Sequence, residues 1–133
     1  MIRSDRHQPW TLVPHLSGLA LLGLVSKDLL MEESDLPGAR FDRAFMLRAV
    51  LIGSRLTGAS IVQATLTGAA LEDVDLSGAN LRGSLLNGAH LRGARFQGAQ
   101  LADARFINAV HAGADFKGAL EMPEHLRAML GPQ

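Results

Sequence analysis

From Leu36 to Leu120 the sequence divides without insertion into 17 pentamers: LPGAR, FDRAF, MLRAV, LIGSR, LTGAS, IVQAT, LTGAA, LEDVD, LSGAN, LRGSL, LNGAH, LRGAR, FQGAQ, LADAR, FINAV, HAGAD and FKGAL. The first position is Leu, Phe, Ile or Met in every pentamer except the one that begins at His111. The fourth position is Ala except at Ser54, Val74 and Ser84, and the third is most often Gly. Repeats of fixed period indicate a solenoid, in which each unit buries its apolar side chains against its neighbours.

A period of five residues fits neither a helix nor a flat strand. In an α-helix five residues advance by about 500°, so the apolar residues would wind around the helix. In a flat strand an odd repeat would place successive large residues on opposite faces. The chain keeps every first position inside only if it turns a corner once per pentamer, and a path that turns the same way at each corner must coil. The interior would then hold the large first-position and the small fourth-position side chains.

The fifth-position charges indicate how many residues make one coil. The glycines fit a spacing of 15 as well as one of 20. At a spacing of 20, one side of the coil carries alternating charges between coils about 4.8 Å apart, and Glu72 lies beneath Arg92. At a spacing of 15, Arg40 would stack on a like charge, Arg55. We therefore predict a four-sided coil of 20 residues with a charge ladder of Asp35, Arg55, Asp75, Arg95 and Asp115.

Two adjoining pentamers carry a resemblance to a known family. Val74-Asp-Leu-Ser-Gly78 and Ala79-Asn-Leu-Arg-Gly83 resemble the pentapeptide-repeat consensus, which is a small residue, Asp or Asn, Leu or Phe, and two variable residues. The resemblance extends over 17 tandem copies, about two-thirds of the chain. It implies the family's all-β fold, a right-handed quadrilateral β-helix, and we expect a bacterial protein. The sequence departs from the consensus because Asp or Asn precedes the large residue only at Asp35, Asp75, Asn80 and Asp115.

Three parts of the chain are expected. Residues 1–15, which include Trp10, are predicted to fold over one side of the solenoid. Residues 16–120 form the β-helix, regular from residue 36, with an irregular first coil at 16–35. In that coil Leu19, Leu24 and Leu29 occupy fourth positions and would plug the open end, while a short helix through Leu16, Leu19 and Leu24 is the alternative.

Residues 121–133 are predicted to form a short capping helix and a tail. Pro123 suits the first turn of a helix over about 123–130, and Gly131 suits its end. Leu126, Met129 and Leu130 would form one apolar face, which either covers the last coil or packs against a second copy.

Several apolar side chains of the solenoid are expected to point outward. One corner of an early coil carries four of them, and Leu85, Ile107 and Val110 follow the same corner towards the C-terminus. Such a patch is either covered by the two terminal segments or used as an interface. We expect a homodimer, and the candidate interface residues are Phe45, Leu47, Val50, Ile52, Leu126, Met129 and Leu130.

Composition excludes several kinds of chemistry. The 133 residues include no cysteine, so thiolate nucleophiles, disulfides and zinc–thiolate sites are excluded. The chain has 13 basic and 13 acidic residues, which argues against a strongly basic nucleic-acid binder. We expect no catalytic, cofactor or metal residues. His111 is predicted to be a hydrogen-bonded interior histidine, and a catalytic or ligand role for it is the less favoured alternative.

These features predict a cytoplasmic, non-enzymatic binding or structural module, which acts through contact with an unknown protein partner. The apolar run from Gly18 to Val25 is too short to span a membrane, so no membrane association is expected. The resemblance implies one sharper alternative, because some pentapeptide-repeat proteins bind DNA gyrase or topoisomerase IV, limit quinolone action and are described as mimics of duplex DNA. The neutral charge of this chain disfavours mimicry, which needs a continuous negative surface.

Overall fold

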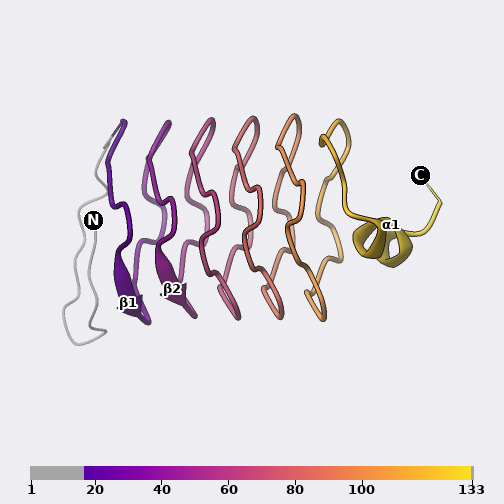
Figure 1. Ribbon diagram of the computed structural model, residues 1–133, viewed down its shortest axis with the longest axis horizontal. Coiled ribbons are helices and arrows are strands. Elements are labelled where there is room, and N and C mark those ends of the chain that lie inside the picture. The colour runs from indigo at the N-terminus through magenta and orange to yellow at the C-terminus, as the bar shows by residue number, and fades with distance from the viewer. Residues whose placement is uncertain (1–16, 133) are drawn as a thin grey trace.

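The computed structural model describes residues 17–132 and shows coils stacked along one axis (Figure 1). Two short strands, β1 (Val25–Lys27) and β2 (Phe45–Leu47), lie in the first two coils. One helix, α1 (Glu124–Leu130), follows the last coil and lies at the C-terminal end of the stack (Figure 1). Among the described residues, no helix combines the length and the apolar character that crossing a membrane requires.

Backbone pairing between coils keeps one constant spacing along the chain. β1 and β2 pair in parallel, with Val25 opposite Phe45. The isolated bridges outside these strands run from Ala20↔Arg40 to Gln100↔Leu120, and each joins two residues that are four pentamers apart. Four pentamers therefore make one coil, in agreement with the spacing of the charge ladder. Each side of a coil is so short between corners that the part of the chain from residue 17 to 132 has only these two brief strands.

Every corner of the coil uses the same backbone turn. The third residue of each pentamer has a positive φ throughout, from Gly18 at 70° to Gly118 at 79°. The N–H group of the fourth residue donates to the carbonyl of the first, as Ala39 does to Leu36 at 3.1 Å, which is the pattern of a type II turn. Glycine is frequent at the third position because it alone adopts this conformation without steric cost. Gln63 and Asp73 adopt it as well, so the corner does not depend on glycine at each repeat.

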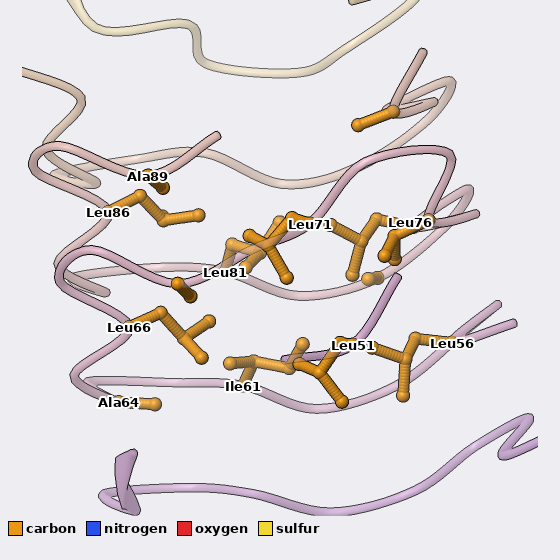
Figure 2. Packing of buried hydrophobic residues seen from close by; sticks show 14 of the residues in the cluster. Leu51, Leu56, Ile61, Ala64, Leu66, Leu71, Leu76, Leu81, Leu86 and Ala89 are labelled. Atoms are coloured by element: carbon orange, nitrogen blue, oxygen red, sulfur yellow. The ribbon is translucent and has the colours of Figure 1, made fainter. Parts of the chain in front are cut away.

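The first and fourth positions fill the interior, as the pentamer pattern predicts. Figure 2 shows two successive layers of large side chains, with Leu56 and Ile61 in one layer and Leu76 and Leu81 in the next. These four side chains are at most 1% exposed. Burial of such a side chain contributes about 1.5–3 kcal/mol, so the stacked layers supply the main stabilisation of the rod.

Two serines at fourth positions satisfy their hydroxyl groups inside the coil, whereas the buried Ser34 Oγ has no hydrogen-bond partner. Ser54 and Ser84 are buried, and their Oγ atoms donate to the carbonyls of Met31 at 2.6 Å and Leu81 at 2.7 Å. Serine therefore replaces alanine at these two positions without leaving its own hydroxyl unpaired.

The first coil keeps the regular register, although its side chains are unusual. Ala20 bridges Arg40 and Leu30 bridges Val50, and the described residues 17–35 contain no helix, so the helical alternative is wrong for them. Leu29 is buried, and Leu19 and Leu24 are half-buried against the core. The irregularity therefore lies in the size of the fourth-position side chains. The expected cover by residues 1–15 lies outside the described residues.

Helix α1 is a cap whose apolar face is turned to the solenoid. Leu126 is fully buried in the core, and Met129 and Leu130 are half-buried against it. Gly131 ends the helix with a φ of 72°, and its N–H group donates to the carbonyl of Arg127 at 3.1 Å. Leu126 is therefore not the exposed interface residue that the sequence suggests, because an apolar side chain at an open solenoid end gains more by covering that end.

Candidate interaction surfaces

The charge ladder forms one column on the outside of the rod. Parallel bridges join its members in order, from Asp35↔Arg55 to Arg95↔Asp115. Arg55 Nε lies 2.8 Å from Asp35 Oδ1, and Arg95 Nη2 lies 3.1 Å from Asp75 Oδ2. Both arginine side chains are more than half exposed, at 52% and 56%. Exposed pairs of this kind contribute about 1 kcal/mol at most, so the ladder supports the register of the coils and does not form a reactive site.

Asp75 is the least exposed member of these ion pairs, at 17% of its side chain. Burial acts to raise the pKa of this carboxyl, but hydrogen bonds from Ser77 and the charges of Arg95 and Arg55 outweigh it, and the pKa is lowered. One of these bonds is donated by the Ser77 N–H group to Asp75 Oδ1 at 3.0 Å. The ionised form therefore stabilises this side of the rod.

Glu72 and Arg92 lie on adjacent coils as predicted, but the structure shows no ion pair between them. Both residues line a shallow pocket of about 220 Å³ with His90 and Val110. Glu72 Oε1 is buried and has no hydrogen-bond partner. The stacking of equivalent positions places two opposite charges on neighbouring coils, but the side-chain rotamers decide whether they meet.

His111 occupies a first position of the last coil. The adjacent bridge His90↔Val110 places it in the interior column after Leu91. Its side chain is only half-buried, whereas Leu91 is fully buried, because no further regular coil covers this end. Within residues 17–132, no cluster of three or more His, Cys, Asp or Glu side chains could hold a metal ion.

Apolar side chains gather on two adjoining sides of the rod. The stacked column Val25, Phe45, Thr65 and Leu85 lies on one side, and the bridges Leu30↔Val50 and His90↔Val110 lie on the next. Val25 is 76% exposed, Phe45 37%, Ile107 48% and Val110 43%. We call this surface the apolar face, and it comprises Val25, Phe45, Leu47, Val50, Ile52, Leu85, Ile107 and Val110.

A groove at the C-terminal end is lined by charged groups that the sequence analysis did not single out. It has a volume of about 480 Å³ and lies between the last coil and α1, and its lining includes Asp103, Arg105, Glu121, Glu124 and His125. In this groove His125 Nε2 accepts a hydrogen bond from the Phe106 N–H group at 3.0 Å. A further regular coil would place a carbonyl acceptor for the Phe106 N–H group at the position that His125 occupies. The spacing between coils could therefore have identified His125.

Comparison with solved structures shows the same fold in proteins of low sequence identity. The pentapeptide repeat protein Rfr23 from the cyanobacterium Cyanothece 51142 is 21% identical, with a TM-score of 0.52 over 77% of this chain and 88% of that one. A trypsin-treated form of QnrB1, a plasmid-mediated fluoroquinolone resistance protein, is 24% identical, with a TM-score of 0.55 over 78% of this chain and 68% of that one. None of the curated proteins compared with this sequence matches it.

The family model for pentapeptide repeats matches residues 31–68 and 69–106. These two segments cover more than half of the chain and include the central coils described above. The resemblance seen in the pentamers is thereby confirmed, and the chain belongs to the pentapeptide-repeat family.

Proposed function

We propose that this chain is a non-enzymatic binding module that makes protein–protein contacts through its apolar face. One observation carries the proposal: of the six large apolar residues that are clearly exposed within residues 17–132, four lie on these two adjoining sides. The opposite sides carry the charge ladder and polar residues such as Asn80 and Gln100. A concentration of exposed apolar side chains on one part of a soluble surface marks an interaction site.

The regular backbone makes this surface well suited to binding. Bridges fix the column from Val25 to Leu85, so its side chains are held about 4.8 Å apart from coil to coil. A rigid scaffold of this kind loses little conformational entropy when a partner binds. We further propose that the coil is right-handed, as the family resemblance implies.

We propose a second copy of the chain as the partner. The apolar face has large side chains near both ends of the rod, with Val25 and Phe45 at one end and Ile107 and Val110 at the other. Between them the column has the smaller Thr65. A surface with the same character at both ends can face a copy of itself across a two-fold axis, which is the commonest symmetry of soluble oligomers.

Analytical ultracentrifugation tests the proposal. We expect a dimer for the wild type, a monomer for Phe45→Glu, and a dimer for the control Gln100→Glu, which adds the same charge to a polar side. Equal melting temperatures of the two variants would show that both are folded. A wild type that stays monomeric at all concentrations would overturn the homodimer. Capture experiments in the native host would then test the wider proposal, which fails if Phe45→Glu retains every protein partner.

A second candidate function is modulation of DNA gyrase or topoisomerase IV. The chain shares its fold with QnrB1, a plasmid-mediated fluoroquinolone resistance protein, at 24% identity, and this shared fold is the reason to test the function. The alternating charges of the ladder do not form a continuous negative surface, so contact would have to differ from DNA mimicry. A supercoiling assay with gyrase, with and without a quinolone, tests this function. Absence of any effect at micromolar protein would remove it.

A further inference from the structure

At the C-terminal end of the solenoid, a side chain accepts a hydrogen bond that a backbone carbonyl accepts in the regular coils. In the regular ladder, the N–H group of a first-position residue donates to the carbonyl of a fifth-position residue on the next coil, as Leu86 does to Arg105 at 2.7 Å. For Phe106 the corresponding residue is His125, which has already entered α1. The imidazole Nε2 of His125 takes the role of the missing carbonyl, at 3.0 Å from the Phe106 nitrogen.

The same helix is held by one apolar anchor and by ring contacts. Leu126, the next residue, is fully buried in the core. The rings of His125 and Phe106 lie 6.4 Å apart, and Phe106 in turn meets Phe116 edge to face at 5.7 Å. The hydrogen bond from Phe106 is therefore a polar attachment of the cap, placed at the edge of an apolar cluster.

Charged groups from three parts of the chain line the groove together with His125. Asp103 and Arg105 come from the last coil, Glu121 from the linker that follows it, and Glu124 from α1 itself. Glu121 Oε1 also lies 3.4 Å from Arg82 Nη2. The groove beside the His125 ring therefore contains three carboxylates and one guanidinium.

We propose that His125 is a pH-sensitive latch, which strengthens the attachment of α1 to the last coil when its Nε2 is unprotonated and weakens that attachment when it is protonated. An imidazole nitrogen that binds a proton from solvent becomes a donor, so it can no longer accept from Phe106. Two N–H groups would then face each other, and the ring would turn towards the carboxylates. Histidine is the side chain that ordinarily changes charge between about pH 5 and 8. Release of α1 would expose the last coil as an unpaired edge, to which another chain can add.

Amide hydrogen exchange measured by NMR tests the latch. Once the rates are corrected for intrinsic exchange at each pH, we expect the Phe106 amide to exchange about two- to tenfold faster at about pH 5.5 than at about pH 7.5, which corresponds to the loss of one hydrogen bond. The matched control is the Leu86 amide, which occupies the same column and donates to a backbone carbonyl. Its corrected rate should not change. Equal corrected rates for Phe106 at the two pH values would overturn the proposal.

Two substitutions separate the latch from a general effect of acid. His125→Gln keeps an acceptor that does not titrate, so Phe106 should remain protected at both pH values. His125→Leu removes the acceptor, so protection should be low at both. His111→Gln, a control at the other histidine of this end, should keep the wild-type response. A pH response of Phe106 that survives in His125→Gln would show that another group controls the cap and would overturn the assignment.

Discussion

Substitution of Ala79 by leucine tests the central feature of the fold, which is that the fourth position of each pentamer faces a filled interior. Ala79 is fully buried in a middle coil. Its N–H group donates to Leu76 at 3.0 Å, and its carbonyl accepts from Gln100 at 2.9 Å, so the backbone cannot move outward without the loss of both bonds. Leucine adds three carbon atoms at a site already enclosed by neighbouring layers. Overpacking of this kind costs about 1–3 kcal/mol or more.

Thermal unfolding followed by circular dichroism measures this cost. For a chain of this length, about 1 kcal/mol corresponds to about 3–6 °C, so we expect the Tm of Ala79→Leu to fall by about 3–18 °C. The matched control is Ala114→Leu, because Ala114 is a fourth-position residue of the last coil and is only half-buried. We expect less than half of the loss there. If Ala79→Leu melts within about 1 °C of the wild type, the interior has spare room and the reasoning about position four is refuted.

Three further predictions follow from the corner, the ladder and the cap. In urea unfolding, Gly88→Ala should lower the free energy of unfolding by about 1–2 kcal/mol because φ is 69° there, and Gly93→Ala should lower it further because the new Cβ would collide with Asp73 Oδ1. Equal losses for the two variants would mean that the Asp73 side chain moves away freely. Burial acts to raise the pKa of Asp75, but hydrogen bonds and arginine charges outweigh burial and lower it. The carboxylate of Asp75 therefore stabilises the fold above about pH 4, and this contribution of less than about 1 kcal/mol is lost as the pH falls further. Asp75→Asn should lack this part of the acid sensitivity when denaturation is compared at about pH 3 and pH 6. Leu126→Ala should weaken the attachment of the cap by about 2–5 kcal/mol, so that proteases cut within residues 121–132 while the central coils stay protected. A C-terminus that remains uncut would contradict the anchoring role of Leu126.

Much of this architecture could be predicted because the repeat is strict. The alternating signs from Asp35 to Asp115 were sufficient to choose four pentamers per coil, since only that spacing brings opposite charges together. The interior columns followed from the first and fourth positions alone. The position of α1 could be predicted to within a residue from Pro123 and Gly131.

The remaining features depend on atoms that a repeat pattern does not specify. The frequent glycine at the third position does not by itself reveal the left-handed backbone that the structure shows there, which Asp73 also adopts. Glu72 was expected to lie beneath Arg92, and it does, but whether two such side chains pair depends on their rotamers. Leu126 was assigned to a candidate interface because an apolar helix face in a sequence does not reveal whether it covers its own chain or another. His125 was overlooked because its role arises only where the regular ladder ends.

The constant pairing of each pentamer with the fourth one after it limits how the length of this protein can change. Duplication or deletion of a whole turn would leave every downstream side chain on its original side and would keep the distance from Phe106 to His125. Removal of a single pentamer between β2 and the last coil would instead rotate everything beyond it by a quarter turn. Ile107 and Val110 would then no longer follow Phe45 along the rod. Natural variants of altered length should therefore differ by whole turns of the coil wherever the outer surface is under selection.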